Sequence, residues 1–175
     1  MPTLGQDVLS DVRRTSGGWM KEQRLVFGLS ANPAHSAHVL LVCEAVQALA
    51  ARGFEVARVL VVPVYRRNPV GSDKAGLVKT YEHRVRLCEL AAEEMQACLT
   101  GTETVVEVSR IAKWLSEASG EPNYTAETLA ALREAAPPDA ELMFLMSSDL
   151  VAVAEPEFAR WYRLDKLTAL ATLVV

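Results

Sequence analysis

One almost uninterrupted apolar run, VARVLVVPV over residues 56–64, constrains the fold more than any other feature of the sequence. A strand covered on both faces has this composition, whereas a strand with one face in water alternates apolar and polar residues. Both faces are covered when helices cross over between parallel strands. The run therefore predicts a parallel sheet that lies between two layers of helices.

The rest of the chain alternates short apolar runs with helix-spaced segments, as such a sheet requires. The other expected strands are residues 24–30, 104–111, 141–147 and 171–175. The expected helices are residues 38–51, with Ser36 as N-cap and Gly53 as stop, and residues 82–98, 125–135 and 164–170. A loop containing Gly120 and Pro122 is expected before the third helix. This order implies right-handed βαβ units, so we predict an α/β fold with a doubly wound parallel sheet.

Length and composition predict one domain. The chain has 175 residues, half of them hydrophobic, which is enough to fold without a disulfide or a metal ion. Residues 1–23 are mixed in character and are expected to be an N-terminal appendage. Residues 24–175 are expected to form the folded domain.

Net charge and cysteine content indicate which classes of binding partner and which cellular compartment to expect. The net charge of −4 argues against nucleic acid or an anionic membrane surface as the main partner. Cys43, Cys88 and Cys98 lie in apolar helical patterns without a CxxC pair, which predicts reduced, mostly buried thiols. Since the sequence has neither an apolar run of about 18 residues nor a signal-peptide core, we expect a cytoplasmic protein.

Two histidines, His35 and His38, stand where the first predicted strand passes into the first predicted helix (LSANPAHSAHVLL). The first turn of a helix presents unpaired N–H groups and the positive end of the helix dipole, which bind anions. No acidic residue lies between Glu22 and Glu44 to balance the imidazoles, but a bound phosphate would. The residues alone leave a second interpretation open, in which both are surface or capping histidines. A metal site is not expected, because a zinc site needs further ligands and His83 is the only other histidine.

A basic segment, YRRNPVGSDKAGLVKTYEHRVR over residues 65–86, follows the strand at residues 56–64. It carries six Lys or Arg residues against Asp73 and Glu82, a local charge of +4. A loop at the carboxyl end of a neighbouring strand would overhang the same crevice as the histidines. The segment therefore predicts a phosphate-binding loop through Arg66, Arg67 and Lys74, with a solvated surface loop as the alternative.

Six segments in fixed order resemble the bacterial nicotinate-mononucleotide adenylyltransferases. They are GLSANPAHSAH, VVPVYRRNPVGSDK, TYEHRVRLCELA, VSRI, NYTAETLAALR and SSDL with WYRLDKL, and together they extend over residues 24–175. These enzymes are nucleotidyltransferases with an HxGH signature. The resemblance implies a Rossmann-like nucleotidyltransferase fold and transfer of an adenylyl group from ATP to nicotinate mononucleotide, which gives deamido-NAD and pyrophosphate.

The resemblance also implies roles for individual residues. It implies catalytic contacts with the ATP phosphates for His35 and His38. The ATP-binding set that it implies is Gly28, Ser30, His35, His38 and Asp149. It implies a nicotinate pocket at Tyr124, Thr125 and Trp161, with simple core packing as the alternative for the indole. The Mg²⁺ of the reaction is expected to arrive on ATP rather than in a protein cage.

The sequence departs from the family pattern at four positions: Leu29, Ala37 and Ser147 replace glycines, and Ala31 replaces a phenylalanine. The sequence also stops at Val175, before an ISTxxR segment that grips the ATP phosphates in relatives. These differences predict weaker binding of ATP than of the pyridine mononucleotide. Two alternatives stay open, a non-catalytic nucleotide-binding paralogue and a nucleotidyltransferase with another phosphorylated acceptor. The sequence is also compatible with a homo-oligomer.

Overall fold

The central sheet has five parallel strands. The computed structural model describes residues 22–66, 79–151 and 157–175. Its strands are β1 (Gln23–Leu29), β2 (Val56–Pro63), β3 (Val105–Val108), β4 (Glu141–Leu145) and β5 (Thr172–Val174), in the order β3-β2-β1-β4-β5. Every pair of neighbours is parallel. The predicted α/β fold with a doubly wound, Rossmann-like sheet is confirmed.

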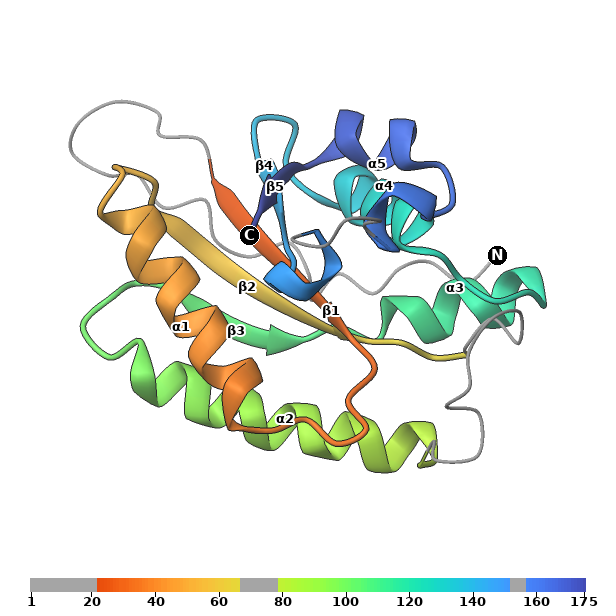
Figure 1. Ribbon diagram of the computed structural model, residues 1–175, viewed down its shortest axis with the longest axis horizontal. Helices are drawn as coiled ribbons and strands as arrows, with labels where there is room; N and C mark the ends of the chain where they lie inside the picture. The colour runs from red at the N-terminus through yellow and green to blue at the C-terminus, as the bar shows by residue number, and fades with distance from the viewer. Residues whose placement is uncertain (1–21, 67–78, 152–156) are drawn as a thin grey trace.

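Helices cover both faces of this sheet (Figure 1). The helices are α1 (Ser36–Ala50), α2 (Tyr81–Cys98), α3 (Ile111–Ser119), α4 (Thr125–Ala135) and α5 (Leu164–Leu170). Two short 3₁₀ helices, η3 (Ser148–Leu150) and η4 (Glu157–Arg160), follow β4. Among the described residues, no helix is both long and apolar enough to cross a membrane.

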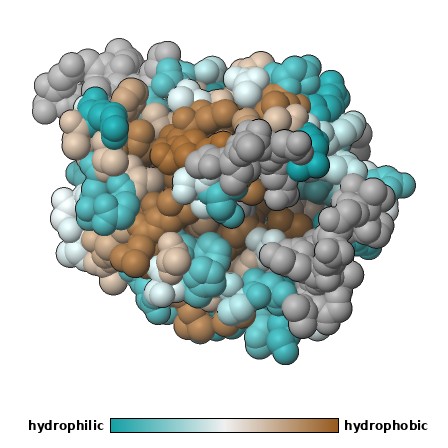
Figure 2. Space-filling view, in the orientation of Figure 1, coloured by the Kyte–Doolittle hydropathy of each residue, from teal (hydrophilic) through white to brown (hydrophobic). Residues whose placement is uncertain are grey.

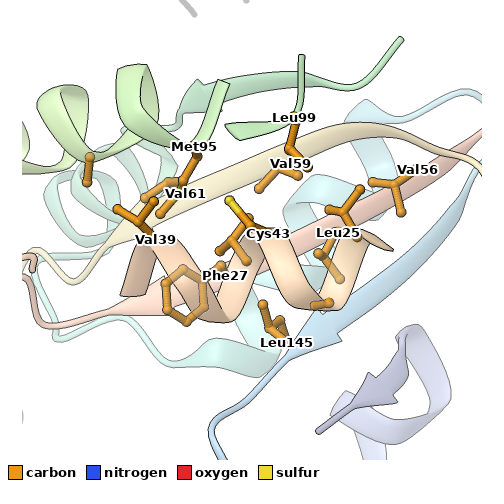
Figure 3. Close-up of a cluster of buried hydrophobic side chains, with 14 of the residues drawn as sticks. Leu25, Phe27, Val39, Cys43, Val56, Val59, Val61, Met95, Leu99 and Leu145 are labelled. Atoms are coloured by element: carbon orange, nitrogen blue, oxygen red, sulfur yellow. The ribbon is translucent and has the colours of Figure 1, made fainter. Parts of the chain in front are cut away.

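Alternate residues of each central strand fill two separate cores. Leu25 and Phe27 of β1 pack with Val39 and Cys43 of α1 and with Met95 of α2, as Figure 3 shows. Val26 faces the other way, into the core beneath α3, α4 and α5. This period of two is the reason that β1 and β2 are apolar almost throughout. In Figure 2, apolar side chains also gather over the middle of the face that Figure 1 presents, with hydrophilic ones around them.

The prediction was wrong between residues 104 and 124. β3 ends at Val108, and residues 111–119 form α3 where a loop was expected. The helix has only nine residues and buries only Ala112 and Ser116, so it was missed although its residues have the spacing of an amphipathic helix. Gly120, which ends it with a φ of 77°, is the one clear sign of a helix terminus. The prediction of mostly buried thiols holds for Cys43 and Cys88, but Cys98 is exposed.

The outer edge of β3 is covered by a side chain from α2. Gln96 accepts a hydrogen bond from the Val106 N–H at 2.8 Å and donates to the Thr104 carbonyl at 2.9 Å. The amide thus forms the hydrogen bonds that a neighbouring strand would form, and it satisfies backbone groups at an otherwise open edge of the sheet.

We expect Gln96→Ala to lower the free energy of unfolding by about 1 kcal/mol, because two hydrogen bonds to a solvent-facing edge are lost. Urea denaturation measures this. Glu94→Ala, a change at an exposed position of the same helix, is the control and should have little effect. Equal stability of the two variants would contradict the edge-covering role.

Candidate active site

The candidate site lies at the carboxyl ends of β1 and β4, where the strand order reverses. From β1 the chain continues to β2 and β3 on one side of the sheet, whereas β4 and β5 lie on the other side. The connections after β1 and β4 therefore separate and leave a crevice between them, the usual ligand site of such sheets. His35 and His38 follow β1, and Asp149 follows β4.

His35 and His38 lie together at the start of α1. The N-cap of the helix is His35, so the prediction of Ser36 was wrong by one residue. The His35 backbone N–H donates to Nδ1 of His38 at 3.2 Å, and the two ring centroids are 3.8 Å apart. Because Nδ1 is an acceptor, the neutral His38 ring carries its proton on Nε2. Nε2–H is then the atom that can donate to a bound phosphate.

The environment of His38 favours its neutral form in the free protein. Burial lowers the pKa of His38 below its ordinary value of 6.5, and the neighbouring His35 lowers it further. No acidic side chain occupies the first turn of α1. A bound polyphosphate would oppose both effects, since a nearby anion stabilises the protonated ring. Binding of a polyphosphate would therefore raise the pKa of His38 and favour its protonated form.

We expect this lowered pKa to make the free protein less stable as the pH falls from 7.5 to 5.5. The unfolded chain takes up a proton at His38 at higher pH than the folded protein does, so folding loses free energy as the pH falls through that range. His38→Asn retains an acceptor for the His35 N–H but does not titrate, and it should lose this part of the pH dependence. Urea denaturation of both proteins at several pH values tests it, and parallel curves would contradict it.

A small cavity adjoins the crevice on the α3 and α4 side of the sheet. Its volume is about 50 Å³, and its lining is formed by Val26, Gly28, Val62, Val64, Ala112, Asn123, Thr125, Thr128 and Phe144. Gly28 helps to keep it open, because a Cβ at that position would lie 3.7 Å from Cε2 of Phe144. A space of this size holds several water molecules.

The start of α4 supplies the polar part of the cavity wall. Tyr124 is the N-cap of the helix, and its N–H donates to the Glu127 carboxylate at 3.1 Å. The Thr128 hydroxyl donates to Oδ1 of Asn123 at 2.8 Å. Sequence reasoning assigned no role to Asn123, although it adjoins the NYTAETL segment that drew attention to Tyr124 and Thr125.

Aromatic side chains from the segment before α5 pack next to the cavity-lining Phe144 and next to Tyr124. Trp161 packs edge-on against Phe144 and Phe158, with centroid distances of 6.0 Å and 5.3 Å. Such contacts are expected if Trp161 serves only to pack the core. They also place its indole beside Phe144, which lines the cavity. Tyr124 stacks on Tyr162 with 4.4 Å between centroids, and Tyr162 is half exposed. Tyr162 is thus an exposed ring next to the predicted nicotinate residues.

Asp149 lies on η3, directly after β4, and its side chain is exposed. The hydroxyl of Ser147 donates to its carboxylate. Ser147 stands where the family pattern has glycine, so this departure adds a hydrogen bond to the carboxylate expected to bind ribose. Ser30, at the facing end of β1, is half-buried.

Only part of the predicted phosphate-binding loop falls within the described residues, because Arg67 and Lys74 lie outside them. The Arg66 guanidinium lies 5.3 Å from the centroid of the Tyr65 ring and donates to the Gly120 carbonyl at 3.4 Å. Arg66 thus connects the end of β2 to the end of α3. A second arginine of the basic segment, Arg84, is buried and hydrogen-bonded to backbone at the crevice, which sequence reasoning missed.

The relatives found by comparison with known proteins are all described as probable nicotinate-nucleotide adenylyltransferases. No protein-family model matches the chain. It is 32% identical over 151 residues to a probable nicotinate-nucleotide adenylyltransferase of Anaeromyxobacter dehalogenans strain 2CP-1, covering 86% of this chain and 67% of that protein. Its identity to a protein of the same description from Streptococcus pneumoniae serotype 4 is 29% over 154 residues, which is 88% of this chain and 62% of the relative. A Staphylococcus epidermidis counterpart is 26% identical over 160 residues, with 89% and 69% covered.

Proposed function

Because the chain belongs to the nicotinate-nucleotide adenylyltransferase family, we propose that it transfers the adenylyl group of ATP to nicotinate mononucleotide. The products are deamido-NAD and pyrophosphate. The observation that carries the proposal is the paired His35 and His38 at the start of α1, beside the point where the strand order reverses. This is the position at which a Rossmann-like sheet binds nucleotide phosphates.

In the proposed reaction a phosphate oxygen of the mononucleotide attacks the α-phosphorus of ATP. The bond from that phosphorus to the bridging oxygen of the β-phosphate breaks, and pyrophosphate leaves with the electron pair. The protein holds two polyanions in line and neutralises the charge that develops. Nε2–H of His38, the His35 ring and the N–H groups of the first turn of α1 are the donors for this task.

Other residues would hold the two substrates. Asp149 accepts hydrogen bonds from the ATP ribose, while Gly28 and Ser30 border the ATP phosphates. Tyr124, Thr125 and Trp161 bind the nicotinate ring. The closeness of all these residues to one end of the sheet supports the assignment.

The Mg²⁺ of the reaction would enter the site bound to the phosphates of ATP. Within the described ranges, no group of three or more His, Cys, Asp or Glu side chains is placed to hold a metal ion. The exposed Asp149 carboxylate is one oxygen donor near the crevice, and Mg²⁺ commonly binds through one or two carboxylates and the substrate phosphates. When bound, the ion would offset the negative charge of the triphosphate.

Pyrophosphate release in the presence of ATP and different acceptors tests the proposed function. We expect release with nicotinate mononucleotide and markedly less with nicotinamide mononucleotide. Release only with another phosphorylated acceptor would favour a different nucleotidyltransferase. Binding of ATP or the mononucleotide without release would favour the non-catalytic alternative.

A further inference from the structure

A buried arginine of α2 joins the ends of the two central strands. Arg84 is 3% exposed and makes four hydrogen bonds to backbone carbonyls. Nη1 donates to the carbonyl of Ser30 at 2.9 Å and to that of Val64, and Nη2 donates to that of Tyr65 at 3.1 Å. Nε donates to the Lys79 carbonyl at 3.2 Å. Ser30 follows β1, and Val64 and Tyr65 follow β2, so one side chain connects the β1 wall of the crevice to the end of the neighbouring strand β2.

The residue before the N-cap of α2 makes a second contact with the turn before α1. The Lys79 N–H donates to Oδ1 of Asn32 at 3.3 Å. Asn32 lies between Ser30, whose carbonyl Arg84 binds, and His35, which begins the histidine pair. The turn between β1 and α1 is therefore held at two points, by Arg84 of α2 and by Lys79 just before that helix.

A guanidinium suits this task because its N–H groups form a rigid, planar fork. The carbonyls at the carboxyl ends of parallel strands have no further strand to bind once the strands separate, so buried ones need another donor. A lysine ammonium at the same place is a point charge and would not reach carbonyls that lie on both strands. Through these four hydrogen bonds to backbone carbonyls, Arg84 acts on the crevice by way of the main chain.

We infer that Arg84 is a positioning residue, which sets the separation between the turn that carries Ser30 and His35 and the segment after β2. The inference rests on the proposed function for its catalytic consequence. Its structural part concerns the free protein and stands apart from any activity. Displacement of reacting groups by about 1 Å is enough to cost ~100-fold in rate.

Arg84→Met and Arg84→Lys test the inference, with Arg133→Met as the matched control. Arg133 also donates to two carbonyls, those of Pro137 and Ala140, but at the opposite end of the sheet, before β4. We expect Arg84→Met to lower kcat about 100-fold while the KM values change less than about threefold, measured well below each melting temperature. Arg84→Lys keeps the charge and should still lose at least about tenfold. Arg133→Met should lose stability but retain kcat.

Backbone amide NMR of the ligand-free proteins gives a readout that needs no activity. Both Arg84 variants should shift the amide signals of Ser30 to His38 and of Val64 to Arg66, whereas Arg133→Met should leave them in place. Full kcat in Arg84→Lys, or unshifted signals in both Arg84 variants, would overturn the inference. If Arg84→Met does not fold, Arg84→Lys decides alone. An inactive wild-type protein would refute the proposed function, and the NMR comparison would still decide the positioning role.

Discussion

His38→Ala should lower kcat for adenylyl transfer by about 100- to 1000-fold, the usual cost of losing a donor that faces developing charge. The side chain is half-buried at the first turn of α1, and its Nδ1 accepts the His35 N–H, which leaves Nε2–H for the phosphates. Steady-state kinetics with saturating ATP and nicotinate mononucleotide measures the loss.

Two further variants separate the donor from the rest of the ring. His38→Asn keeps an acceptor for the His35 N–H and removes Nε2, so it should be nearly as slow as His38→Ala. His83→Ala is the control, because His83 is exposed on α2 and no part of the proposed mechanism uses it. Turnover near that of the wild type in His38→Asn would refute the assignment of Nε2–H.

Gly28→Ala should weaken substrate binding while leaving the fold intact or slightly more stable. The new methyl group would lie 3.7 Å from Phe144, an ordinary contact, and a strand gains about 0.5–1 kcal/mol when glycine is replaced by alanine. The methyl group would also occupy part of the cavity beside Asn123 and Thr125. One extra carbon in a fitted pocket costs roughly tenfold or more in binding. Calorimetry with nicotinate mononucleotide and with ATP measures it.

Gly53→Ala should have the opposite effects: a loss of stability and unchanged nucleotide binding. Gly53 lies after α1 with a φ of 84°, so a side chain there strains the backbone by roughly 1–2 kcal/mol. No cavity atom is near it, because nothing lies within 4 Å of its hypothetical Cβ. Gly53→Ala should therefore lose stability and keep its affinities. If Gly28→Ala binds both nucleotides as tightly as the wild type, the cavity has no part in the site.

The fold was predictable because its strongest signals are local. The β-branched run of β2 indicates burial on both faces, and the periodic spacing of α4 and α5 gave their bounds correctly. α3 was missed because it has only nine residues, although these have the spacing of an amphipathic helix.

The arrangement of the candidate site was predictable only where its residues lie in one segment of the sequence. His35 and His38 are three residues apart in a helix turn, so their proximity follows from helix geometry. Ser36 was an attractive N-cap by residue type, but α1 begins at Ser36 and its N-cap is His35, whose backbone N–H donates to His38. The role of Arg84 depends on carbonyls 20 and 54 residues away, which no local pattern encodes.

The fate of the α-phosphorus of ATP tests the central claim most directly. With ATP labelled at that atom and nicotinate mononucleotide as acceptor, we predict that the label appears in deamido-NAD, with one unlabelled pyrophosphate released for each molecule formed. Chromatography and mass spectrometry of the products would show it. Label that remains in ATP, or that is released only as AMP, would contradict adenylyl transfer by this protein.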